Sequence, residues 1–132
     1  MDKRLIRLIK EYVDAINAAV LQLRASGIPI PNSDVEWATN GIQQSGVLDG
    51  GGRYYKHGYG CAVHSTDCVV DFDFGAEGQT NGFDCWRLAG FAGDRLGKFG
   101  FMTVDELKTV FDEATASGEL RSSGYMLYYL NP

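Results

Sequence analysis

Residues 56–86 hold most of the side chains in this chain that could do chemistry. The stretch is KHGYGCAVHSTDCVVDFDFGAEGQTNGFDCW, with both histidines, all three cysteines, four aspartates and one glutamate. After its first residue it has no lysine or arginine. Such a set could form a metal site, a thiol active site, a carboxylate pair or an acidic binding surface. The spacing of the residues separates these possibilities.

A calcium site is the first possibility, since calcium takes oxygen ligands from acidic, glycine-containing loops. The acidic residues around the turn are Asp71, Asp73, Glu77 and Asp84. The spacing does not fit an EF-hand, because its fifth and twelfth positions would be Gly75 and Gly82. The alternative is that Asp71 and Asp73 are the solvent-side residues of an alternating strand, and this interpretation is favoured.

Thiol and acid–base chemistry are the next possibilities. In one continuous strand, His57 and Cys61 would lie about 13 Å apart, too far for a nucleophile and its base. Cys61 also falls in an apolar row, where cysteine behaves as a small hydrophobe. Asp71 and Asp73 would share one face about 7 Å apart, but nothing predicts the burial that would tune their pKa values. A small enzyme or metal-dependent protein using His57, Asp71, Asp73 and Asp84 therefore stays as the alternative to a non-enzymatic protein.

The elements that position these residues follow from hydrophobic periodicity. Apolar residues recur at intervals of three and four over 3–25, which predicts an amphipathic helix ending before Gly27. A short second helix is expected over 33–42, followed by a loop over 45–52. Asp84 and Thr103 can each cap a helix, the second through the capping box TVDE at 103–106, with a stop at Gly118.

Two strands, at about 54–64 and 68–75, are predicted from period-two alternation. Pairing them around 66–67 sets Val63 opposite Val70 and Cys61 opposite Phe72. The other face then holds Asp71 beside small residues: Gly58, Gly60 and Ala62, with Asp73 also on this side. A closing strand is expected at about 124–130. The predicted fold is α+β: one domain over 1–132, with a small antiparallel sheet packed with about four helices.

Composition restricts the partners. The first ten residues carry four basic side chains and one acid, so the remaining 122 hold eight basic and sixteen acidic side chains. Such a body disfavours nucleic acid and anionic membranes and attracts basic partners. Three cysteines without zinc-type spacing are interpreted as reduced thiols of a cytoplasmic protein, with no metal or cofactor. The N-terminal segment is predicted to be neither a signal peptide nor a membrane span.

Three motifs carry a resemblance to a known type of family. HGYGC contains His57, Gly58, Gly60 and Cys61, VVDFDFG covers 69–75, and NGFDCWRL covers 81–88 with Trp86. Together they resemble a family of small, uncharacterised bacterial proteins, and small acidic families of this kind resemble the immunity proteins of toxin systems. The resemblance implies a protein that binds and blocks a cognate toxin, often a basic nuclease, without catalysis of its own.

The function expected from the sequence is therefore protein binding through an acidic surface. Aromatic residues beside charges are typical of a protein interface, and the charge would steer a basic toxin domain. The residues expected to contact the partner are Asp71, Asp73, Glu77, Asp84 and Tyr59. His57, Gly58, Gly60, Cys61 and Trp86 are expected to serve the structure. The chain would act as a monomer or a homodimer.

Overall fold

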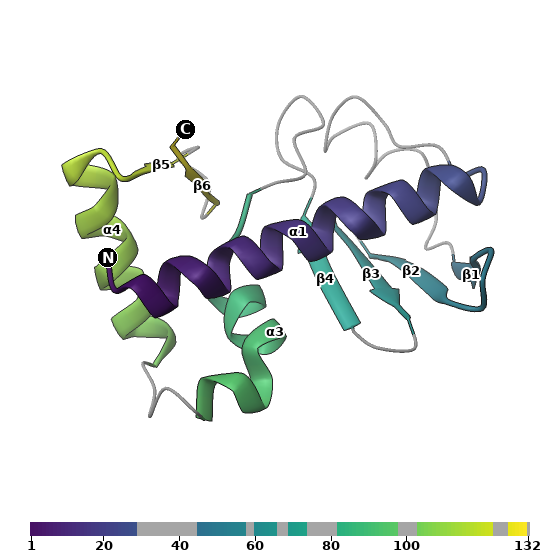
Figure 1. Cartoon of the computed structure of the whole chain (residues 1–132), viewed down its shortest axis with the longest axis horizontal. Helices are drawn as coiled ribbons and strands as arrows, with labels where there is room; N and C mark the ends of the chain where they lie inside the picture. The colour runs from purple at the N-terminus through teal and green to yellow at the C-terminus, as the bar shows by residue number, and fades with distance from the viewer. Residues whose placement is uncertain are drawn as a thin grey trace. The chain divides into compact units, whose positions relative to one another are not determined.

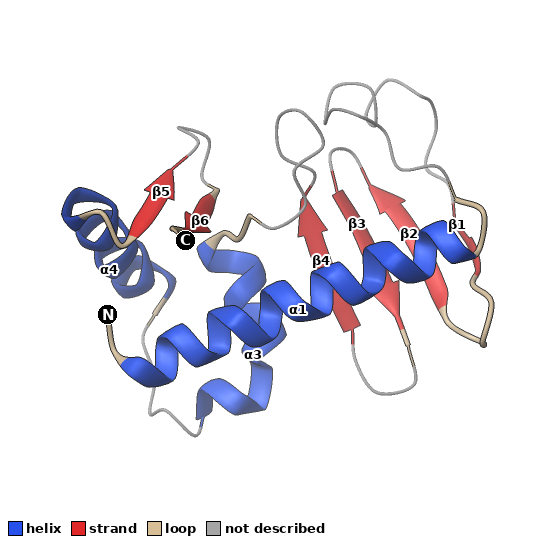
Figure 2. Cartoon of the chain, turned by 45° about the horizontal axis from the view of Figure 1, so that its top comes forward, coloured by secondary structure: helices blue, strands red, loops and turns tan. Residues whose placement is uncertain are grey.

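The computed structural model of the chain describes residues 1–28, 45–57, 60–65, 69–73, 82–97, 103–122 and 127–131. Within these residues it contains three helices, a four-stranded antiparallel sheet and a two-stranded antiparallel sheet (Figure 2). The predicted α+β class is confirmed. The chain forms two compact units: a helical unit, Met1–Tyr12 with Gly82–Pro132, and a sheet unit, Val13–Asn81.

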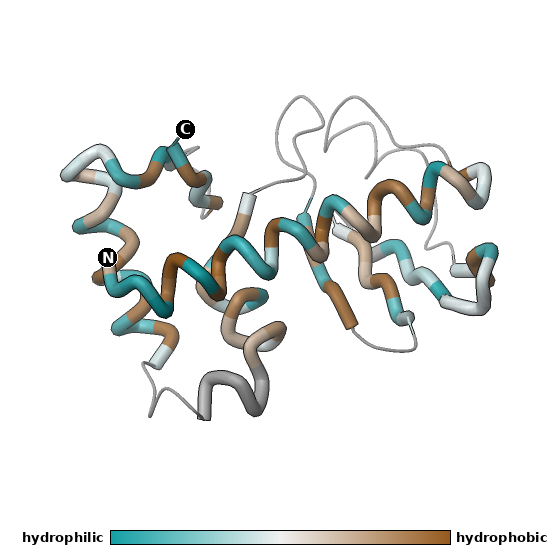
Figure 3. The backbone as a smooth tube through the Cα atoms, viewed as in Figure 1, coloured by the Kyte–Doolittle hydropathy of each residue, from teal (hydrophilic) through white to brown (hydrophobic). Residues whose placement is uncertain are grey.

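Helix α1, Lys3–Ala25, has the predicted bounds and contributes to both units. Hydrophobic and hydrophilic positions alternate along its length (Figure 3), as expected for a helix with one buried face. Gly27 follows at φ 80°, a left-handed conformation that glycine adopts without a Cβ penalty, and the helix ends there.

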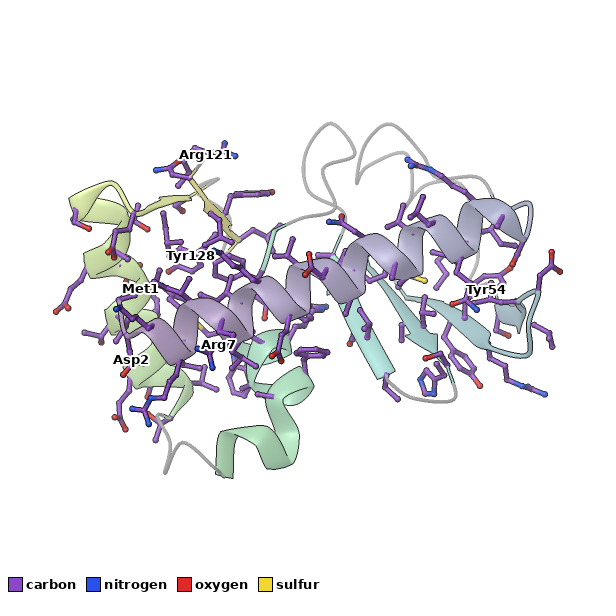
Figure 4. The ribbon with its side chains drawn as sticks, viewed as in Figure 1. Met1, Asp2, Arg7, Tyr54, Arg121 and Tyr128 are labelled. Atoms are coloured by element: carbon purple, nitrogen blue, oxygen red, sulfur yellow. The ribbon has the colours of Figure 1, made fainter. Side chains whose placement is uncertain are left out.

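The sheet unit contains the strands β1 (Ser45–Val47), β2 (Arg53–His57), β3 (Gly60–His64) and β4 (Val69–Asp73), in that spatial order. The second half of α1 lies across one face of this sheet (Figure 1). The core between them contains Ile16, Ala19, Val20, Leu23, Leu48, Tyr54, Cys61, Val63, Val70 and Phe72. The ring of Tyr54 packs so closely over Gly46 that a Cβ there would lie 2.9 Å from it (Figure 4).

The predicted register of the β3–β4 pair is confirmed: Val63 is opposite Val70, and Cys61 is opposite Phe72. The prediction of one strand over 54–64 is wrong. Residues 53–57 and 60–64 are two antiparallel strands, with His57 registered against Gly60. A glycine opens the two-residue connection between them, and such connections are a hairpin signal.

Two further predictions of the sheet unit have different outcomes. The expected loop over 45–52 is wrong in its first part, because Ser45–Val47 pairs with Arg53–Tyr55 as β1. The loop begins only at Leu48, whose N–H donates to the carbonyl of Gly52 at 2.7 Å. The expected helix over 33–42 lies outside the described residues.

The helical unit contains α3 (Cys85–Gly97), α4 (Val104–Ser117), β5 (Leu120–Ser122) and β6 (Tyr128–Leu130). The capping box of α4 is confirmed: Thr103 Oγ1 accepts from the N–H of Glu106 at 3.2 Å, and Glu106 accepts from the N–H of Thr103. The helix ends at Gly118, φ 87°. The C-terminal strand is confirmed at 128–130, but it pairs with β5 in a sheet of its own and does not extend the main sheet.

Aromatic rings fill the core of the helical unit. Phe83 meets Phe111 edge-on with ring centroids 5.3 Å apart, and Phe111 lies 5.2 Å from Tyr128. Tyr12 packs on Phe91 at 5.0 Å. The Tyr12–Phe91 contact joins α1 to α3, and the Phe111–Tyr128 contact joins α4 to β6, so the helical unit has an aromatic core of its own.

Candidate functional site

The register of the main sheet assigns its residues to two faces, since directly paired residues project on the same side. The inward face carries Tyr54 and Lys56 of β2, Cys61 and Val63 of β3, and Val70 and Phe72 of β4, all of them buried. The outward face consists of three cross-strand rows. They are Val47–Arg53–His64–Val69, Ser45–Tyr55–Ala62–Asp71, and position 57 with Gly60 and Asp73.

The outward face brings two of the predicted binding residues together. Asp71 and Asp73 are half-buried on β4, directly beside Ala62 and Gly60. A floor of small residues next to two carboxylates was expected, and the register confirms it for Gly60 and Ala62. Gly58, Tyr59 and Glu77 lie outside the described residues.

The outward face also exposes large apolar side chains. Val47, Tyr55 and Val69 retain 66%, 40% and 54% of their accessible surface, and Tyr55 makes an edge-on contact with His64 at 5.1 Å. The single strand predicted over 54–64 would put Tyr55 on the same side as Cys61, so this patch was not expected from the sequence. The glycine at position 58 was the sequence signal for a hairpin, and a hairpin would have placed Tyr55 on the face opposite Cys61.

Cys61 does not form a site with a histidine. It lies on the inward face in the row of Lys56 and Phe72, whereas position 57 belongs to an outward row. Burial raises the pKa of the Cys61 thiol to about 12, so the thiol remains protonated at neutral pH. Cys61 was expected to serve the structure, and its side chain lies in the core of the sheet unit. The His57 side chain is outside what the structure describes.

Asp84 is almost fully buried, at 3% exposure, and caps α3. Its Oδ1 accepts from the backbone N–H of Arg87 at 2.7 Å, and its Oδ2 accepts from the Arg87 guanidinium at 2.8 Å. The prediction that Asp84 begins a helix is confirmed. Both carboxylate oxygens bind Arg87 in the first turn of α3. Asp84, which was expected to contact the partner, therefore stabilises the start of this helix.

The neighbours of Asp84 in the sequence are structural too, with one exception. Gly82 lies against the ring of Tyr129, so a Cβ there would come within 2.9 Å of it. Phe83 exchanges two backbone hydrogen bonds with Tyr128, at 2.9 and 2.8 Å. Trp86 was expected to serve the structure, yet 66% of its surface is exposed.

A small polar network joins β6 to α4. The hydroxyl of Tyr128 donates to Asp112 Oδ1 at 2.7 Å, and Lys108 Nζ donates to Asp112 Oδ2 at 2.8 Å. The Lys108 ammonium, and then the Tyr128 hydroxyl, lower the pKa of Asp112. Burial, and then Asp112, raise the pKa of Tyr128. The network fixes β6 to α4 at neutral pH and contains no activated base or nucleophile.

The described residues do not gather a metal site: among them, no three His, Cys, Asp or Glu side chains are placed to share an ion. Asp71 and Asp73 belong to the sheet unit and Asp84 to the helical unit, where it is engaged with Arg87. In the same part of the chain, no helix is both long and apolar enough to cross a bilayer.

The fold defines a small α+β protein whose main sheet exposes apolar side chains on its outward face. Residues 5–130 match the family described as a domain of unknown function (DUF6896), and the chain belongs to that family. No curated protein and no solved structure matches the chain.

Proposed function

We propose that this protein is a non-enzymatic, cytoplasmic binding protein, and that it acts as an immunity protein that neutralises a cognate bacterial toxin by contact. The outward face of the β1–β4 sheet is the proposed contact surface. Tyr55 and Val69 would be its apolar anchors, and Asp71 and Asp73 would be its charged residues. This assignment moves the centre of the surface away from Asp84, which is buried at the start of α3.

One observation carries the proposal: the outward face combines exposed apolar side chains with carboxylates. Val47, Tyr55 and Val69 keep 40–66% of their surface exposed to water, whereas the β2–β4 side chains on the opposite face of the same sheet are buried. Aromatic and aliphatic anchors within a polar rim are typical of protein interfaces, and tyrosine is enriched among residues that dominate binding energy.

The charge of the chain supports a basic partner. The formal net charge is −5, and Asp71 and Asp73 place two acids at one edge of the exposed patch. Opposite charges accelerate encounter, and the contacts of the apolar anchors then determine the rate of dissociation. A basic toxin domain, such as a nuclease, fits both requirements.

The test is to mix the purified protein with the toxin domain encoded beside its gene and to measure binding by titration calorimetry and protection by co-expression. Tyr55→Ala and Asp71→Lys should each weaken binding about tenfold or more. Glu113→Lys, the matched control, reverses an exposed acid on α4 and should leave the affinity within about twofold. No complex and no protection would overturn the proposal.

A further inference from the structure

The outward face has an ordered arrangement of charge as well as exposed apolar side chains. Arg53 on β2 and His64 on β3 share one end row, and both are exposed. Asp71 and Asp73 lie on the edge strand β4, one and two rows further along. Arg53 and Asp71 are therefore separated by one strand and one row, a diagonal of about 12 Å.

We infer that this face is self-complementary and binds a second copy of the chain as a weak two-fold dimer. In a two-fold interface, any contact between one residue of the first copy and a different residue of the second copy occurs twice. A cation and an anion on the same surface can therefore form two equivalent contacts across the interface. A two-fold axis in the plane between the sheets, passing over β3, places Arg53 of each copy against Asp71 of the other. Both contacts then form together.

The centre of the face suits such an approach. Ala62 lies on β3 between Tyr55 and Asp71, in the same cross-strand row. Its small side chain allows two sheets to come close. Val47, Val69 and Tyr55 flank the centre and would lose water contact in a sheet-on-sheet packing about 10 Å apart. The dimer would complete a layer on the side of the sheet opposite α1.

The size of the face sets the strength of the dimer. Three strands of five residues and one of three, spaced about 4.8 Å and rising about 3.4 Å per residue, give a flat area of about 300 Å². Standard stable interfaces bury about 800 Å² on each partner, and smaller ones form transient complexes. The dimer therefore forms at high protein concentration and exchanges readily with the monomer. It does not depend on the proposed toxin partner, although such a partner would compete for the same face.

Sedimentation equilibrium of the full chain, from about 10 µM to about 1 mM, tests the inference, since this range covers the affinities of weak complexes. The wild-type protein should shift from monomer to dimer, less so at high salt because exposed charges are screened. Arg53→Asp alone and Asp71→Arg alone should each raise the dissociation constant about tenfold or more, because each variant sets like charges against one another twice.

Mixing the two single variants in equal amounts provides the decisive comparison. In the mixed dimer, the aspartate at position 53 of one copy meets the arginine at position 71 of the other, while native Asp71 meets native Arg53. The mixture, and likewise the double variant Arg53→Asp/Asp71→Arg, should recover dimer. Arg24→Asp, an exposed charge reversal on α1, is the control and should dimerise like the wild type. A monomer at about 1 mM, or a dimer unaffected by these reversals, would overturn the inference.

Discussion

Asp84 offers the sharpest test of whether the motif around it serves the fold or a partner. Its carboxylate has two separate roles: Oδ1 caps α3 through the N–H of Arg87, and Oδ2 binds the Arg87 guanidinium. Replacing Asp84 by alanine removes both interactions, whereas asparagine keeps an acceptor for the N–H and loses the charge. The two variants therefore separate the cap from the ion pair.

The expected magnitudes follow from these contacts. Loss of an N-cap side chain costs about 1 kcal/mol. The Asp84 side chain is 4% exposed and that of Arg87 is 27% exposed, so the ion pair is partly shielded and adds about 1–2 kcal/mol. Asp84→Ala should lower the free energy of unfolding by about 2–3 kcal/mol, and Asp84→Asn, which keeps the cap, by about 1–2 kcal/mol.

Urea denaturation followed by circular dichroism measures these differences, provided that the m-value is unchanged. Arg87→Met and the double variant Asp84→Asn/Arg87→Met complete a cycle that isolates the coupling between the two side chains. Glu113→Ala removes an exposed acid on α4 and should change the free energy of unfolding by less than about 0.5 kcal/mol. If Asp84→Ala were as stable as Glu113→Ala, the assignment of Asp84 as a buried cap would be refuted.

Gly82→Ala should lower the free energy of unfolding by about 1–3 kcal/mol, because the added Cβ would press on the Tyr129 ring. Gly90→Ala in α3 places its Cβ in open space and should be neutral or stabilising. Equal stabilities of the two variants in urea denaturation would contradict this. In the variant Cys68→Ser, Cys61 and Cys85 should resist thiol reagents at pH 8 until urea unfolds the chain, because burial raises their pKa values to about 12 and about 11. Rapid labelling of these two thiols in the folded protein would count against this prediction. The two thiols bind their protons more tightly in the folded state than in the unfolded state. Their contribution to the free energy of unfolding should therefore be fully present below pH 9 and decline as the pH rises toward 11–12, as measured by urea denaturation at several pH values. A free energy of unfolding that stays unchanged up to pH 11 would argue against this.

Local patterns in the sequence determined the helices and one strand pair. The bounds of α1, the capping box at Thr103 and the stop at Gly118 depend only on side-chain periodicity and on caps within a few residues. The register of β3 and β4 followed because a slip by one residue would expose every apolar side chain of the pair. These features are encoded by neighbours in the chain, so they needed no knowledge of the packing.

The candidate site was predictable only in part. Asp71 and Asp73 lie beside small residues as expected, because period-two alternation places them there. The use of Asp84 depends on how tightly α3 packs, since the same residue could cap a helix and remain exposed. Its burial at 3% is a property of the assembled helical unit and has no signature in the local sequence.

The orientation of Tyr55 was decided by tertiary structure alone. In one continuous strand, residues 55, 57, 61 and 63 share a face, and the alternation over 54–64 satisfies that pattern. With His57 registered against Gly60, odd positions of β2 project outward while odd positions of β3 project inward. The chain reversal between β2 and β3 therefore changes which positions project outward, from odd numbers in β2 to even numbers in β3. The alternation of residue types along 54–64 is the same in both arrangements. The pairing of β2 with β3 selects the one that exposes Tyr55.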